Sequence, residues 1–391
     1  MAKLNEIFIK SFSGEWGAED LDGTGTPVLR TTNFTNHGVI NYTDVVTRNI
    51  KKKNISDKYL SKGDIIIEKS GGSDKQPVGR VVFFDGEEGK YLFNNFTGLL
   101  RVKNKDEWLP RYVFYALFAN YCVGGTRRYE NRTTGLHNLQ LDAYLYGTEI
   151  KKRNYEIQIE IVNNLDKVSE LIGRFKEQLQ DFDLLIKSRF IEMFGDLKLN
   201  DKKWEVKFFK DLTLLITDGE HSTPRRTDNG IYLLSARNVL NHSLQLNDID
   251  YIDEVEYERI SKRIQPMIGD VLLSCSGSVG RCCAITKDIK FQMVRSVALL
   301  RFKAEINPVF AEYMIVSDYL QEQINSNKTA SSQSNLFQGK IKMLKGVIPP
   351  LDLQNQFADF VEEVNKSKLE VQKSLEELET LKKSLMQQYF G

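Results

Sequence analysis

The chain of 391 residues contains one segment twice, and this repeat constrains its fold more than any other feature. Residues 161–195 return as residues 357–391, displaced by 196 positions, so that Val168 corresponds to Val364. Self-similarity at a fixed displacement is the signature of a repeated architecture. A displacement of this length predicts two whole domains, each followed by the same long element.

The repeated element has the pattern of a long helix. From Tyr155 to Phe194 there is neither proline nor a cluster of turn-forming residues, and apolar residues recur at alternating spacings of four and three. This is the heptad pattern of helices that pair along a seam. About 40 residues make a helix of roughly 60 Å, which cannot bury its stripe against one small domain. The interface residues expected in this helix are Ile161, Leu165, Val168, Ile172, Phe175, Leu179 and Phe182.

The second copy is expected to begin after Pro349-Pro350, with Asp352 as its cap. Lys368 and Lys382 stand at seam positions that hold isoleucine in the first copy, where they either snorkel at the edge or set the pairing register. The first helix leaves the first domain and arrives at the second, so pseudo-symmetry predicts that the second helix returns antiparallel to it. The interface residues expected in the second helix are Phe357, Val361, Val364, Val371, Leu375 and Leu378.

The segments before the helices carry short strand patterns separated by turn-forming residues. Residues 268–274 resemble residues 61–67, with Asp270 matching Asp64, and residues 276–281 resemble the stretch from Ser70 to Arg80, with Arg281 matching Arg80. The displacement falls from 206 to 201 between these matches, so the first domain carries five extra residues at about 73–77. Helices with proline in the first turn are expected at 110–121 and 308–324.

We therefore expect an α+β fold with an internal pseudo-two-fold repeat: two β-rich domains joined by two long antiparallel helices that form a coiled coil. The expected limits are 1–153 for the first domain, 154–196 for the first helix, 197–350 for the second domain and 351–391 for the second helix.

Composition limits the possible functions. The formal net charge is only +1, so any contact with DNA must come from local basic patches or from a basic partner. The four cysteines form no Cys-x-x-Cys pair and the four histidines are scattered, so no metal site is expected. No apolar run reaches about 18 residues, and the first residues lack the pattern of a signal peptide. We expect a cytoplasmic protein with reduced thiols and no membrane contact.

Motifs for catalysis are missing from the sequence. There is no Gly-x-Gly-x-x-Gly after a strand and no Walker loop. The proline pair at 349–350 lacks the flanking residues of the motif with which amino-methyltransferases hold a flipped base. Asp64 with Glu68-Lys69 is a weak nuclease pattern, because adjacent strand residues point to opposite faces. We expect no catalytic residue in this chain.

Polar loops at matching points of the two domains supply candidate DNA contacts, since Arg, Asn, Gln, Ser and Thr bind phosphates and base edges. The alternative for any one residue is a solvated turn, and Arg80 and Arg281 could equally tie a loop to its own domain. The first-domain candidates are Arg30, Asn33, Lys69, Lys75, Arg80, Arg127, Arg128 and Arg132. The second-domain candidates are His221, Thr223, Arg225, Arg237, Asn238, Ser278, Arg281 and Lys340.

This order of parts resembles the specificity subunit of type I restriction-modification systems over essentially the whole chain. Residues 218–224, Asp-Gly-Glu-His-Ser-Thr-Pro, resemble the start of that family's domain. Residues 345–356 resemble its exit from a strand through prolines into a helix. The first domain departs from the pattern, because it lacks the histidine and the double proline.

The resemblance implies a non-catalytic subunit in which each domain recognises one half of a split double-stranded DNA target, while the helix pair sets the gap. It also implies two methyltransferase subunits that dock on the chain and bind S-adenosylmethionine, with two restriction subunits as further partners. The chain itself would hold no cofactor. The alternative from another class is a protein–protein scaffold with a coiled-coil assembly handle. A third, a fused restriction enzyme, is disfavoured by the missing motifs.

Overall fold

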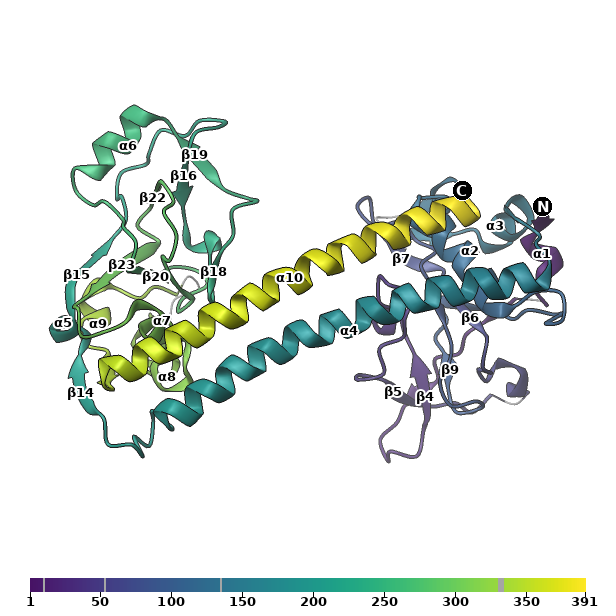
Figure 1. Cartoon of the computed structure of the whole chain (residues 1–391). Coiled ribbons are helices and arrows are strands. Elements are labelled where there is room, and N and C mark those ends of the chain that lie inside the picture. Colours follow the sequence, from purple (N-terminus) through teal and green to yellow (C-terminus); the bar gives the residue numbers. More distant parts are fainter. Residues whose placement is uncertain (10, 53, 134–135, 330–333) are drawn as a thin grey trace. The chain divides into compact units, whose positions relative to one another are not determined.

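The computed structural model describes residues 1–9, 11–52, 54–133, 136–329 and 334–391, although the side chains of residues 132 and 133 are not described (Figure 1). The chain forms two compact units. The first unit comprises residues 1–176 and 373–391, and the second comprises residues 177–372. Each unit therefore contains one β-rich domain together with part of each long helix.

The first unit is built mainly of short strands. Its helices before the long ones are α1 (Leu4–Ile7), α2 (Pro110–Cys122) and α3 (Leu141–Gly147). Its strands are β1 (Ala2–Lys3), β2 (Phe12–Ser13), β3 (Ala18–Glu19), β4 (Thr26–Leu29), β5 (Val46–Asn49), β6 (Ile65–Glu68), β7 (Ser70–Gly72), β8 (Val81–Phe83), β9 (Leu92–Phe93), β10 (Thr97–Leu100), β11 (Glu130–Thr133), β12 (Leu136–Leu139) and β13 (Glu149–Ile150). Their sheet orders are β2-β10-β6-β8, β3-β5-β4-β9, β11-β12-β7 and β1-β13.

The second unit has the same kinds of parts in the same chain order. Its helices are α5 (Phe209–Leu212), α6 (Glu254–Ser261), α7 (Pro308–Val316), α8 (Asp318–Asn327) and α9 (Gln338–Ile341). Its strands are β14 (Glu205–Phe208), β15 (Thr213–Asp218), β16 (Ile231–Leu234), β17 (Val239–Leu240), β18 (Ser243–Leu244), β19 (Asp250–Ile252), β20 (Asp270–Ser274), β21 (Cys282–Ala284), β22 (Phe291–Met293), β23 (Val297–Phe302) and β24 (Lys345–Ile348). Their sheet orders are β15-β23-β20-β21, β19-β16-β22, β14-β24 and β17-β18.

One four-stranded antiparallel sheet organises each domain. Successive side chains of a strand point to opposite faces, so a fully buried strand separates two cores. In β6, Ile65 and Ile67 pack into one apolar cluster and Ile66 into another. In β20, Val271 and Leu273 likewise pack away from Leu272. The internal repeat inferred from the sequence is thus present in the fold.

A charged clamp recurs at the same point of both sheets. Arg101 binds both carboxylate oxygens of Asp64, at 2.8 and 2.6 Å, and Arg301 binds both oxygens of Asp270, at 2.7 and 2.8 Å. Such bidentate pairs are strong and geometrically specific. Asp64 therefore ties the start of β6 to the end of β10, which accounts for the acidic position that weakly resembles a nuclease motif.

The two long helices are α4 (Tyr155–Phe194) and α10 (Leu351–Phe390), each of 40 residues. In the first unit, Asn164 donates to Tyr389 at 3.2 Å and Lys176 pairs with Glu379 at 3.0 Å. Residue numbers thus rise along one helix as they fall along the other, so the helices are antiparallel there. In the second unit, Asp183 binds Lys368. The rings of Phe190 and Phe357 lie 5.3 Å apart between their centroids, so the helices are antiparallel there too.

These observations confirm the predicted fold class, α+β with paired long helices. The limits expected at 1–153, 154–196, 197–350 and 351–391 stay predictions, because the compact units divide both long helices.

The helix expected at 308–324 is in fact broken. Ser317 is extended, with φ −63° and ψ 153°, and it separates α7 from α8. The cap expected at Asp352 is also different, since α10 already begins at Leu351 and the carboxylate lies in its first turn.

The expected seam is only partly a coiled-coil interface. Ile161 and Leu165 also belong to the core of the first domain, and Phe357 belongs to that of the second, because the helix ends pack on their domains. The buried members are Ile161, Leu165, Val168, Ile172, Phe357, Val361, Val364 and Leu375. The half-buried members are Phe175, Leu179, Phe182, Val371 and Leu378. No helix in the described ranges is long and apolar enough to cross a membrane.

Candidate nucleic-acid interface

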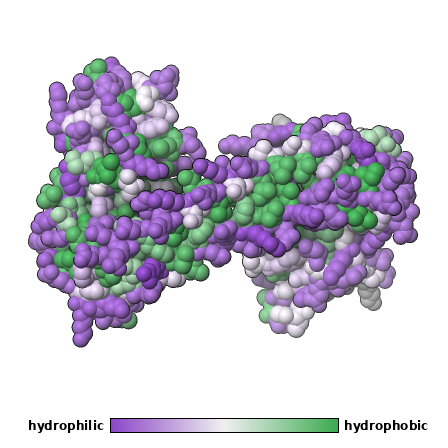
Figure 2. Space-filling model, viewed as in Figure 1, coloured by the Kyte–Doolittle hydropathy of each residue, from purple (hydrophilic) through white to green (hydrophobic). Residues whose placement is uncertain are grey.

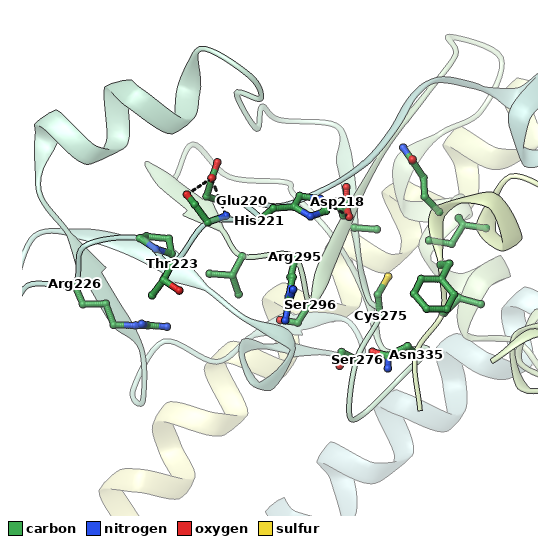
Figure 3. Close-up of a pocket in the computed structure, with 18 residues that line it drawn as sticks. Asp218, Glu220, His221, Thr223, Arg226, Cys275, Ser276, Arg295, Ser296 and Asn335 are labelled. Carbon is green, nitrogen blue, oxygen red and sulfur yellow. Dashed lines mark hydrogen bonds and ion pairs between the residues drawn. The ribbon is translucent and has the colours of Figure 1, made fainter. Parts of the chain in front are cut away.

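A cavity of about 670 Å³, lined by both polar and apolar side chains, lies at one end of the main sheet of the second unit (Figure 3). Strands β15 and β20 both run antiparallel to β23, so their carboxyl ends meet the start of β23 at the same edge. Four loops gather there and line the cavity. They contribute, among others, Glu220 and His221 after β15, Ser276 after β20, Arg295 before β23 and Asn335 before α9.

Backbone hydrogen bonds fix these loops against one another. The Glu220 amide donates to Met293 at 2.8 Å, and the Arg295 amide donates to the Glu220 carbonyl at 3.0 Å. Gly219 is required between them, because a Cβ atom at this position would lie 2.3 Å from the Met293 oxygen. The Leu336 amide closes the far wall by donating to Cys275 at 2.9 Å. The cavity is therefore preformed.

Both acids and bases line the cavity. His221 Nε2 lies 2.9 Å from an Asp218 carboxylate oxygen. The Ser222 hydroxyl, which donates a hydrogen bond to Glu220, is the main cause that lowers the pKa of this carboxyl, with Arg259 and Arg263 adding to the effect. Arg295 is exposed, and within the described ranges its guanidinium makes no hydrogen bond or ion pair. The site therefore presents hydrogen-bond acceptors next to the guanidinium of Arg295, which is unpaired within the described part of the chain.

The structure brings some of the predicted second-domain residues to this cavity and leaves others beside it. His221 and Thr223 line it. Arg225 pairs with Asp253, and Arg237 with Asp250 at 3.0 Å, on the neighbouring sheet. The other three candidates, Ser278, Arg281 and Lys340, lie on the loops after β20 and on α9, outside the cavity lining.

Asn33 and Asn238 need correction as candidate DNA contacts, because both are buried. Asn238 donates to the carbonyls of Gln245 and Asp248, at 3.0 and 2.9 Å, and accepts from the Ser235 amide at 2.9 Å. Asn33 makes the equivalent bonds in the first domain, to two carbonyls and from the Arg30 amide. Each amide group is used in shaping a loop, so both asparagines support the fold and do not face a ligand.

Arg80 likewise serves its own domain. It donates to the carbonyls of Thr31 and Phe34, at 3.0 and 2.9 Å, and pairs with Glu68 at 3.3 Å. Its counterpart Arg281 has no side-chain hydrogen bond or ion pair within the described ranges. The alternative that these arginines tie a loop to its domain therefore describes Arg80 and not Arg281.

The remaining first-domain candidates are partly engaged. Arg30 pairs with Asp44 at 3.0 Å. Lys69 donates to the Ser13 hydroxyl at 2.8 Å, and burial is the main cause that lowers its pKa. Lys75 is exposed on the five-residue insertion. Next to it, Arg127 donates to the Asp74 carbonyl at 3.2 Å. The guanidinium of Arg128 lies 4.8 Å from the centroid of the Tyr129 ring. The side chain of Arg132 lies outside the described residues.

Sequence reasoning missed Arg295. The available signal was the Val294-Arg295-Ser296 turn between two apolar strand patterns, but that turn contains no glycine or proline.

The described residues contain no group of three His, Cys, Asp or Glu side chains able to hold a metal ion. Burial raises the pKa of the Cys275 and Cys283 thiols to about 12. These two thiols are therefore protonated and inert near neutral pH.

Two related β-rich domains with polar loop faces and paired long helices define a duplicated, helix-linked binding protein. Residues 201–380 match the model of the type I restriction modification DNA specificity domain. This segment, which contains the whole cavity of the second unit, belongs to that domain family. The resemblance that the sequence indicates is thereby confirmed.

Similar proteins extend this finding. A protein of Methanocaldococcus jannaschii, assigned as the MjaX specificity subunit of a type I restriction enzyme, is 26% identical over 194 residues. The match covers 48% of this chain but only 45% of that relative.

Among solved structures, the S subunit of a type I restriction-modification system from M. genitalium is similar over 100% of this chain and 95% of its own, with a TM-score of 0.60 at 14% identity. A second structure, described as addressing complex assembly and conformational transition of the type I R-M system, covers 99% of this chain and 96% of its own. Its TM-score is 0.52 at 13% identity. At these identities the likeness concerns the fold alone.

Proposed function

We propose that this chain is the DNA-specificity subunit of a type I restriction-modification complex, in which each β-rich domain binds one half of a two-part duplex target. The observation that carries the proposal is the position of the preformed cavity. It lies inside the matched segment 201–380, at the end of the main sheet of the second unit where four loops of that unit gather. Its carboxylate, imidazole, guanidinium and amide side chains supply the donors and acceptors that bind base edges and phosphates.

The cavity and its surroundings suit different parts of DNA. The Asp218 and Glu220 side chains repel phosphate but accept hydrogen bonds from the amino groups of cytosine or adenine. Arg295 and Arg281 are free to bind phosphate or the edge of guanine. Arg225 and Arg237 would exchange their carboxylate partners for phosphates when DNA arrives. His221, Thr223, Ser278 and Lys340 complete this set of proposed contacts.

In the first domain, the proposed contacts cluster around the five-residue insertion. Lys75 is exposed on it, and Arg127 and Arg128 lie on the adjacent turn. Arg30 and Lys69 would act as further phosphate anchors once released from Asp44 and Ser13. The insertion is a loop that the second domain lacks. We therefore expect the two domains to recognise half-sites of different sequence.

We also propose that the helix pair sets the gap between half-sites and docks two methyltransferase subunits, with restriction subunits as further partners. A groove of about 1030 Å³ in the first unit supports a docking role. Figure 2 shows hydrophobic side chains between α4 and α10 there, and Phe114 and Phe118 of α2 line the groove. Lys382, at its rim, forms no ion pair within the described ranges. The groove suits an apolar partner segment that also carries a carboxylate.

In this proposal the chain supplies recognition and no bond-making step. S-adenosylmethionine would bind to the methyltransferase subunits, and the complex would act on DNA in the cytoplasm. The test is selection from a random duplex library by the chain assembled with its methyltransferase partner. Enrichment of one two-part motif supports the proposal. Tight assembly without any enriched motif would support the protein scaffold instead.

A further inference from the structure

The first unit contains a loop without counterpart in the second. Residues 73–77 stand between β7 and the buried Val78, whereas in the second unit only Gly277 and Ser278 separate Ser276 from Val279. Lys75 is exposed on this loop. An extra polar loop is usually mobile, because it has few buried contacts to hold it. This one is held at several points.

A buried histidine lies at the centre of these contacts. His137 of β12 is only 6% exposed. Its Nδ1 lies 2.9 Å from one carboxylate oxygen of Glu130, and the other Glu130 oxygen accepts a 3.0 Å hydrogen bond from the Val78 amide. Its Nε2 lies 3.7 Å from the carboxylate of Asp74. A single imidazole thus links the base of the loop to the acidic residue beside Lys75.

Further contacts hold the other side of the loop. The Ser73 amide donates to the Gln76 carbonyl at 2.7 Å, which closes the turn. Gln76 donates to the Asn36 side chain at 3.3 Å, and the same Asn36 oxygen accepts from Arg80 at 3.2 Å. The loop is therefore fixed on two sides, and Lys75 is presented from a rigid base.

We propose that His137 is a positioning residue for DNA recognition by the first domain, and that it holds loop 73–77 as a specificity element which the second domain does not have. This inference rests on the proposed function. The imidazole holds the exposed Asp74 carboxylate at the base of the loop, and the Asp74 carbonyl binds Arg127, so that Lys75 and Arg127 are presented to the ligand together. Preorganisation of this kind improves binding by reducing the ordering cost that the complex must bear.

The test uses the full chain assembled with its methyltransferase partner and compares methylation rates on duplexes with single base changes in either half-site. His137→Ala removes the link at its centre. Asp74→Ala removes only its outer end, and because the Asp74 side chain is 82% exposed this change leaves packing intact. Asp106→Ala, at an exposed acid elsewhere in the first unit, is the matched control.

Both loop variants are expected to lose about tenfold in discrimination at the half-site read by the first domain, with unchanged discrimination at the other half-site. The control is expected to retain both. Equal losses at the two half-sites, or no loss at the first, would overturn the inference. If the unaltered complex discriminates at neither half-site, the proposed function fails, and that result is distinct from a failure of the loop variants alone.

Discussion

Lys368 of α10 donates a hydrogen bond of 2.5 Å to the Asp183 carboxylate of α4, within the second unit. The lysine stands at a seam position where the first copy of the repeat has isoleucine. Its pairing with a carboxylate at the edge of the helix pair favours the register-setting role for this residue. Lys382, in the first unit, instead has its pKa lowered, mainly by burial and secondly by Arg111. The two seam lysines therefore have different environments.

The first prediction concerns this pair. Asp183 is 70% exposed on its side chain, so its removal by Asp183→Ala is expected to cost less than about 1 kcal/mol of unfolding free energy. Lys368→Ile, which extends the apolar stripe, is expected to raise the stability by about 1 kcal/mol. Urea unfolding measures both changes, with Lys366→Ile on the exposed face as the control. A large loss of unfolding free energy in Lys368→Ile would contradict this prediction and would mean that the lysine stabilises the helix pair.

The second prediction concerns the charged clamp of the main sheets. Asp270 is fully buried and bound at both oxygens by Arg301, so Asp270→Asn leaves a buried guanidinium edge without its charge partner. We expect a loss of about 3 kcal/mol, measured by chemical denaturation. Asp248→Asn, at an exposed acid in the same unit, is expected to change little. A loss below about 1 kcal/mol would mean that the clamp is dispensable.

The third prediction concerns Arg295 at the cavity mouth. Arg295→Ala is expected to weaken binding of the cognate duplex by about 1–3 kcal/mol and to relax one base position if the guanidinium reads guanine. If it binds phosphate, the loss should instead be uniform across sequences and the salt dependence shallower. Binding isotherms at two salt concentrations separate these cases. Unchanged affinity and selectivity would remove Arg295 from the interface.

The fourth prediction concerns pH. The folded state lowers the pKa of Glu220, chiefly through the Ser222 hydroxyl. A carboxyl with a lowered folded pKa stabilises the fold above its unfolded pKa, and this contribution is lost as the pH falls through the folded value. Unfolding free energy should therefore drop on acidification below about pH 4.3, and less steeply in Glu220→Gln. Parallel acid limbs in the two proteins would contradict this account.

The repeat made the fold predictable, because two copies of a heptad stripe require a partner and each copy supplies one for the other. The α+β class and the antiparallel helices follow from that argument. The break at Ser317 did not, since nothing in the local sequence forbids a continuous helix. The site was harder to predict. Asn33 and Asn238 have the chemistry of base readers, but their burial depends on loops folding over them, which no spacing reveals. The position of Arg295 in the cavity depends on strands that are distant in the sequence ending at the same place in the fold.

The most direct test of the central claim is a methylome comparison of cells that express the methyltransferase partner with and without this chain. The account predicts one methylated motif of two half-sites and a fixed gap that appears only when the chain is present, and a changed gap after matched heptad insertions in α4 and α10. A confirmed complex whose methylation pattern does not depend on the chain would contradict the account.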